Sequence, residues 1–215
     1  MRIPYPTLRQ PPPLYRYMEP EFARLAVERG SFRLSTAAEA AKLEDGLRDD
    51  LDSGVRLRWG GGLVDDAPGR GAMKSLGLDI SGPVRVHFGP GDIEARVHGN
   101  ILCMTDKAPN DYIRRRAPEK SSLVRIDDVI AFGWALTGSL AAQLELKTLG
   151  FSGDQVIYDK TEFSEIVEVR QPSPFIKAEV FEEESEWRLY WATPEPRPTI
   201  IECEEACQFL TLVVP

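Results

Sequence analysis

The chain has 215 residues, 42% of them hydrophobic and 28% charged, values typical of a globular protein large enough to bury a full core. Its formal net charge of -8 argues against broad, non-specific nucleic-acid binding and leaves room only for a local basic groove. No stretch resembles a signal peptide, and no apolar run reaches the roughly 18 residues that a membrane span requires, so we expect no membrane partner.

The domain organisation predicted from the sequence is simple. Residues 1–13 are proline-rich and are expected to run extended before the fold begins. Residues 14–215 are expected to form a single α+β domain, because strands and helices mix without a regular βαβ alternation. The expected architecture is a mixed or split antiparallel sheet with a few flanking helices.

The first elements follow the proline-rich segment. Residues 14–18 are rich in aromatic side chains and predict a short strand. A helix is predicted from Pro20, which suits a first turn, to Gly30, which suits a helix end. Residues 31–35 predict a second strand, and residues 36–39 have the form of a capping box that starts another helix.

The middle of the chain is rich in strand patterns. Residues 59–71 are rich in glycine but lack the known phosphate-loop spacings, so a mobile surface loop is expected there. Residues 84–88 and 93–97 alternate apolar and other side chains, and the turn residues 89–92 between them predict a hairpin. Residues 101–104 are a further strand candidate.

A long apolar helix is predicted over residues 129–149, with Asp127 or Asp128 as its N-cap. The strand before it is predicted at residues 122–126. Further strands are expected near residues 155–158, 166–169, 187–191 and 209–214.

The run Glu184–Arg188 carries the most chemistry. As a strand from residue 185 onward, it places Trp187 and its apolar neighbours at 189 and 191 on one face, and Glu184, Glu186, Arg188 and Tyr190 on the other. Side chains two apart on a strand face lie roughly 6.5–7 Å apart. Two carboxylates and a guanidinium in a row could bind a pair of ribose hydroxyls or steady a developing cation. The alternative is a solvated acidic edge strand with an ion pair.

Two further groups are candidates for binding. Arg16, between Tyr15 and Tyr17, could clamp a phosphate through two hydrogen bonds, or it could be a surface arginine packed on tyrosine. Ser35 and Thr36 could support a site by hydrogen bonding, or they could simply cap a helix. The basic triplet at residues 114–116 is expected to be a solvated loop or helix end.

The order of an arginine on the first strand, a serine–threonine pair at the second and a late E-x-E resembles the arginine–serine–glutamate class of ADP-ribosyltransferases. The resemblance implies that Arg16 holds NAD, the substrate, with help from Tyr17 and Thr36, and that Ser35 positions the nicotinamide ribose. It implies further that Glu186 steadies the oxocarbenium-like state, with Glu184 as its upstream partner. Such a transferase acts on a protein or nucleic-acid acceptor, or hydrolyses NAD, commonly as a bacterial toxin or defence factor.

A second resemblance extends over most of residues 14–191, to the uncharacterised bacterial DUF2971 family. Where that family reads close to F-N-D-P-F-E, residues 43–48 read L-E-D-G-L-R and keep the aspartate. The other similar stretches are residues 14–17, 32–35, 101–105, 175–177 and 184–188.

Two other functions stay open. The same groove could belong to a non-catalytic binding, sensor or immunity module, because its aromatic side chains suit a partner surface equally. A metal-dependent nuclease could gather a divalent cation with Asp45, Glu184 and Glu186. Three cysteines and two histidines make a disulfide framework and a cysteine–histidine metal site poor expectations, and a reducing, cytoplasmic location fits best.

Overall fold

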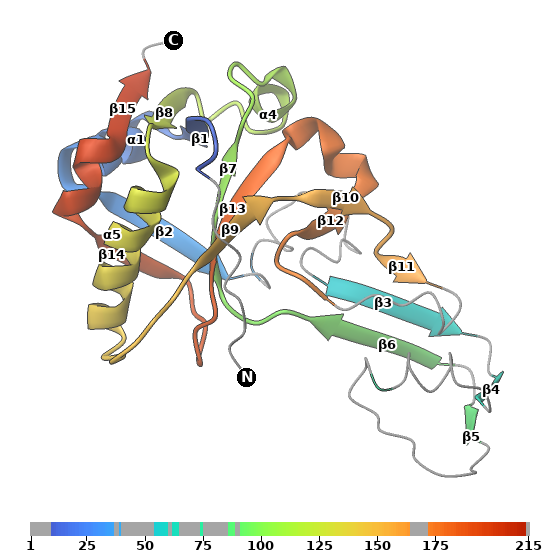
Figure 1. Ribbon diagram of the computed structural model, residues 1–215. Coiled ribbons are helices and arrows are strands. Elements are labelled where there is room, and N and C mark those ends of the chain that lie inside the picture. Colours follow the sequence, from blue (N-terminus) through green and yellow to red (C-terminus); the bar gives the residue numbers. More distant parts are fainter. Residues whose placement is uncertain are drawn as a thin grey trace. The chain divides into compact units, whose positions relative to one another are not determined.

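The computed structural model of the protein describes residues 10–36, 39, 54–59, 62–64, 74, 86–88, 91–163 and 172–213 (Figure 1). The contacts divide the chain into two compact units, which is a finer division than the single domain predicted over residues 14–215. Unit 1 comprises Met1–Thr36, His98–Val156 and Phe181–Pro215, and unit 2 comprises Ala37–Val97 and Ile157–Val180. Each unit is therefore assembled from separated stretches of sequence.

Unit 1 contains an eight-stranded sheet in which every pairing is antiparallel. Strands β14, β2, β7, β1, β8 and β15 follow one another in space, while β13 pairs with β7 and β9. The α+β class and the predominantly antiparallel sheet predicted from the sequence are confirmed. The strands are β1 Leu14–Met18, β2 Ser31–Thr36, β7 Asn100–Thr105, β8 Ser122–Ile126, β9 Ser152–Gln155, β13 Glu186–Trp191, β14 Thr199–Glu202 and β15 Leu210–Val213.

Strand β7 lies at the centre of this sheet and contacts three strands. β13 pairs along its whole length, from Glu186 opposite Thr105 to Trp191 opposite Asn100 (Figure 1). Thr105 also pairs with a residue of β1, and Asn100 with a residue of β2. Since a strand has two edges, β1 and β2 share the edge opposite β13, one at each end. We call the interval between them, at residues 102–104, the β1–β2 split, and no described strand pairs with it on that edge.

Two helices cover the sheet of unit 1, and both begin as their sequences predict. α1 spans Pro20–Arg29 and ends at Gly30, whose left-handed φ of 61° suits glycine. α5 spans Val129–Gln143, with the Asp128 side chain accepting the Ala131 amide as its N-cap. The predicted end of α5 at residue 149 is wrong, because the chain turns out of the helix at Glu145, where φ is 55°.

The core of unit 1 is formed by the apolar faces of the central strands and of these two helices. Trp191, Phe32, Phe132 and Leu34 are almost completely buried there. The indole Nε1 of Trp191 donates to the Thr137 hydroxyl at 2.8 Å, so the buried polar atom of the ring is satisfied. This face of β13 also contributes Trp187 and Leu189 to the core, as the predicted alternation requires.

Unit 2 corrects the predicted hairpin of residues 84–97. Both strands exist, but β5 pairs with β4 and β6 pairs with β3, each antiparallel. β4 also lies within the predicted surface loop 59–71, and the strand predicted at 155–158 breaks at Val156 between β9 and β10. The strand predicted at 166–169 and the helix start at 37–38 lie outside the described residues. The strands are β3 Gly54–Trp59, β4 Gly62–Val64, β5 Val86–Phe88, β6 Gly91–Arg96, β10 Ile157–Asp159, β11 Glu162–Phe163 and β12 Ile176–Ala178.

The remaining helical turns of the described chain are short. α4 spans Asp111–Arg116, and two 3-10 helices span Glu179–Glu184 (η2) and Glu204–Phe209 (η3). In the part of the chain that is described, none of the helices has the length and apolar character needed to cross a membrane.

Candidate functional site

Glu186 and Arg188 form a buried ion pair on β13. They lie two apart on β13 and so point to the same face, away from the tryptophans. Arg188 Nε donates to Glu186 Oε1 at 2.6 Å and Nη2 donates to Oε2 at 3.0 Å. The Arg188 side chain is 0% exposed and the Glu186 side chain is 6% exposed. This two-point contact fixes the orientation of the Glu186 carboxylate.

Glu184 does not share this strand face, and the predicted row of two carboxylates on one strand is wrong. Glu184 is the last residue of η2, and Ser185, with φ of 48°, turns the chain before β13 begins at Glu186. The Glu184 carboxylate instead lies 3.7 Å from the guanidinium of Arg116 on α4. Glu184 and Glu186 are therefore separated by a turn that no alternation pattern reveals.

Arg16 lies on β1 and reaches into the β1–β2 split. Its Nη1 donates to the Cys103 carbonyl oxygen at 2.6 Å, on the interval of β7 that β1 and β2 leave without a strand partner. Its Nε atom is buried and has no hydrogen-bond partner in the described part of the chain. Burial lowers the pKa of Arg16; the side chains of Cys103 and Glu186 act to raise it, and Arg33 lowers it further. Arg16 and Glu186 are thus within electrostatic reach of each other.

Ser35, Thr36 and Tyr17, the other predicted binding residues, have different positions relative to β7. Ser35 pairs with Ile101 and Thr36 pairs with Asn100, so both lie at one end of the β1–β2 split. Tyr17 is buried, and its hydroxyl accepts the Asn110 backbone N–H at 2.5 Å. The Tyr17 hydroxyl therefore holds a neighbouring loop.

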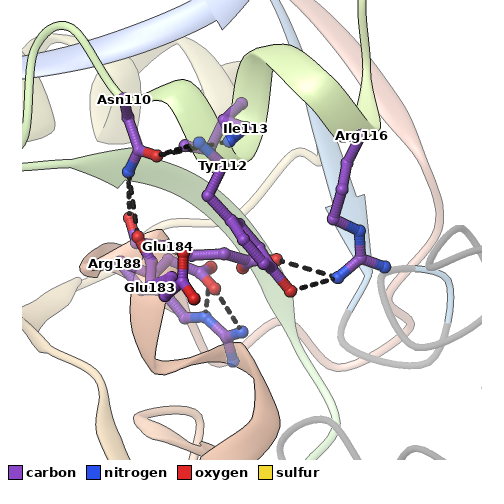
Figure 2. Close-up of polar contacts among 8 residues, drawn as sticks. Asn110, Tyr112, Ile113, Arg116, Glu183, Glu184 and Arg188 are labelled. Carbon is purple, nitrogen blue, oxygen red and sulfur yellow. Dashed lines mark hydrogen bonds and ion pairs between the residues drawn. The ribbon is translucent and has the colours of Figure 1, made fainter.

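Sequence reasoning missed Asn110, which contacts the segment before Glu186. Its Oδ1 accepts the amides of Tyr112 and Ile113 at the start of α4, while Nδ2 donates to the carbonyl oxygens of Glu183 and Glu184 (Figure 2). An Asn followed by an Asp before a short helical turn is a recognisable N-cap pattern. The contact of Asn110 with residues 183 and 184 could not be predicted from the sequence.

The basic triplet at residues 114–116 ends α4, which agrees with the predicted helix end. Arg116 lies over the rings of Tyr112 and Phe181. Its Nη1 donates to the Tyr112 hydroxyl at 2.8 Å (Figure 2). Arg115 lies 4.0 Å from the exposed Glu183 carboxylate. Arg115 and Arg116 therefore face the acidic run that precedes β13 and partly neutralise its charge.

No group of three or more histidine, cysteine, aspartate or glutamate side chains suited to a metal ion occurs among the described residues. Asp45, one of the three residues of the nuclease hypothesis, lies outside them. Cys103, Cys203 and Cys207 form no disulfide bond with one another.

Comparison with known proteins gives no match to a family model, a curated protein or a solved structure. The resemblances to ADP-ribosyltransferases and to DUF2971 therefore rest on the motifs quoted above. What the fold adds is position: Arg16, Ser35 and Glu186 come from three strands that all pair with β7.

Proposed function

We propose that unit 1 binds NAD at the β1–β2 split and cleaves its nicotinamide–ribose bond, transferring ADP-ribose to an acceptor or to water. The observation that carries the proposal is the position of Arg16. Its buried Nε has no hydrogen-bond partner among the described residues, and its guanidinium lies within electrostatic reach of Glu186. A buried donor without an acceptor is costly unless a ligand satisfies it, and a phosphate oxygen is a suitable ligand.

The proposed reaction assigns one role to each residue. Arg16 binds a phosphate oxygen of NAD, and Ser35 hydrogen-bonds the nicotinamide ribose. The bond between nicotinamide and the anomeric carbon breaks, and its electron pair leaves with nicotinamide, which becomes neutral. The Glu186 carboxylate stabilises the positive charge that develops at the anomeric carbon. The acceptor hydroxyl, amine or water then bonds to that carbon and loses a proton.

Nicotinamide release from NAD tests this proposal. Wild type is expected to release nicotinamide, and Glu186→Gln, which keeps the shape of the side chain but not its charge, to be at least about 100-fold slower. Arg16→Lys is expected to raise KM, because a lysine cannot bind a phosphate oxygen and the Cys103 carbonyl in the same planar geometry. Glu182→Gln is the matched control, because Glu182 is exposed on the neighbouring 3-10 helix. Equal rates in wild type and Glu186→Gln, or neither release nor NAD binding by wild type, would sink the proposal.

A non-catalytic NAD-binding or sensor module is the second candidate, and the Glu186–Arg188 pair favours it. Both oxygens of the Glu186 carboxylate are hydrogen-bonded by Arg188, an arrangement that suits a structural ion pair. Binding of NAD by calorimetry without nicotinamide release would assign this module function. Loss of that binding in Arg16→Lys would place the ligand at the β1–β2 split.

A further inference from the structure

The four residues before Glu186, residues 182–185, form a turn that sets where β13 begins. We call them the entry turn. Ser185 has a left-handed φ of 48°, which is unfavourable for a residue other than glycine. The Ser185 amide donates to the Glu182 carbonyl within the turn at 3.1 Å. Because this conformation is unfavourable, contacts from outside the turn must hold it.

The contacts come from Thr105, the last residue of β7, and from the residues that follow it along the chain. The Thr105 hydroxyl donates to the Glu184 carbonyl at 2.8 Å. The Ser185 hydroxyl donates to Asp106 Oδ1 at 2.5 Å, and the Asp106 amide donates back to the Ser185 carbonyl at 3.3 Å. Thr105 is also the residue opposite Glu186 in the β7–β13 ladder. The entry turn is therefore fixed directly beside the glutamate that it precedes.

Asn110 completes this set and joins the entry turn to α4. Its Nδ2 donates to the carbonyls of Glu183 and Glu184 at 3.1 and 3.2 Å (Figure 2). Its Oδ1 accepts the amides of Tyr112 and Ile113 at 3.1 and 3.2 Å. The residue is only 4% exposed. Both ends of one amide are thus used, the oxygen for the helix and the nitrogen for the entry turn.

We infer that Asn110 is a positioning residue for Glu186, holding the entry turn so that β13 begins at Glu186 and its carboxylate keeps the two-point contact with Arg188. The expected effect on catalysis rests on the proposed function, whereas the positioning of Glu186 rests on the hydrogen bonds alone. Among the common helix-capping side chains, asparagine alone supplies an acceptor and a donor on one planar group. Aspartate caps a helix equally well but carries no N–H for the two carbonyls.

Asn110→Asp therefore separates the two roles. The cap on α4 is kept, while a carboxylate oxygen meets the carbonyls of Glu183 and Glu184 and cannot donate to them. We expect hydrogen–deuterium exchange over residues 182–188 to become about fivefold to tenfold faster, with α4 unchanged. In nicotinamide release, kcat is expected to fall about tenfold or more with KM nearly constant, because the reacting carboxylate is misplaced while NAD binding at Arg16 persists.

One further variant serves as a control, and another repeats the test at a second donor. Asp128→Ala removes the N-cap of α5, whose side chain accepts the Ala131 amide at 2.9 Å and does not contact the entry turn. It is expected to leave the exchange of residues 182–188 and kcat unchanged. Thr105→Val removes the other donor to the Glu184 carbonyl and is expected to act as Asn110→Asp does. It replaces Asn110→Asp if that variant does not fold.

The outcomes of this experiment are distinguishable from those of the proposed function. Wild-type exchange in Asn110→Asp overturns the inference whether or not the protein cleaves NAD. Faster exchange with an unchanged kcat also overturns it, because the entry turn would then move without consequence for Glu186. If wild type releases no nicotinamide, the proposed function fails, and the exchange of residues 182–188 decides whether Asn110 positions Glu186.

Discussion

The guanidinium of Arg188 holds both carboxylate oxygens of Glu186, its neighbour two residues earlier on the same strand. Neither side chain has appreciable access to water. Such a pair is costly to bury and becomes far more costly when one partner is removed. Removing one of the two side chains would therefore leave a buried charge without its partner.

The first prediction concerns this pair. Arg188→Met leaves the Glu186 carboxylate buried without its partner and is expected to lower the free energy of unfolding by about 3–5 kcal/mol. The double variant Arg188→Met, Glu186→Leu, which removes both charges, is expected to recover most of that loss. Urea unfolding followed by circular dichroism measures both. A double variant no more stable than Arg188→Met would contradict the prediction.

The second prediction concerns the hydroxyl of Tyr17. Tyr17→Phe removes the acceptor of the Asn110 amide, which lies in a buried environment, and is expected to cost about 1–3 kcal/mol of unfolding free energy. Tyr15→Phe is the matched control on the same strand, since no hydrogen bond of the Tyr15 hydroxyl occurs in the described part of the chain, and should change stability by less than about 0.5 kcal/mol. Equal effects of the two substitutions would show that the Tyr17 contact does not matter.

The third prediction concerns alkaline pH. Burial raises the pKa of Tyr190 above the ordinary value of 10.0, and its hydroxyl donates to the His98 carbonyl at 2.8 Å. A raised pKa in the folded state means that the unfolded chain loses this proton first. The stabilising contribution is therefore complete below pH 10.0 and is lost as pH rises through the folded pKa.

The measurement is the urea midpoint of wild type and of Tyr190→Phe at pH 8 and again at a pH above the ordinary pKa of tyrosine. Wild type is expected to lose more stability between the two than the variant does, because only wild type carries the titrating phenol. Parallel changes in the two proteins would argue against a shifted pKa at Tyr190.

The fourth prediction compares two glycines. A side chain at Gly30 would overlap the Cys203 carbonyl oxygen, and the residue has a left-handed φ of 61°, so Gly30→Ala is expected to cost more than about 1 kcal/mol. Gly138 is exposed within α5, and apart from its neighbours in the helix backbone no described atom lies within 4 Å of the place that a Cβ would take there. Gly138→Ala should therefore raise stability by about 0.5–1 kcal/mol. Thermal unfolding distinguishes the opposite signs, and a stabilising Gly30→Ala would contradict the close approach.

Local signals in the sequence predict the elements of unit 1 well. The aromatic strand at residues 14–18, the helix from Pro20 to its glycine end and the Asp128 cap all occur as expected. Each depends on backbone preferences and hydrogen bonds within a few residues, which the sequence carries directly. The apolar face of β13 was predictable for the same reason.

Partners distant in the sequence were not predictable. Alternation identifies β5 and β6 as strands, but pairing depends on which other edges are near, and they pair with β4 and β3. The separation of Glu184 from Glu186 depends on the left-handed conformation of one residue, Ser185. The acidic run around it does not indicate that conformation. The clamp formed by Asn110 depends on contacts across more than seventy residues of chain.

The three-strand pairing of β7 also constrains the order in which the chain acquires its structure. β7 needs β1 and β2 from the first 36 residues on one edge and β13, which begins at Glu186, on the other. During synthesis, the edge of β7 that pairs with β13 stays open until β13 has left the ribosome. Long loops must close before these contacts form, which slows folding. An exposed β7 edge during that interval is a place where nascent chains could pair with one another, so unit 1 should benefit from a chaperone until β13 arrives.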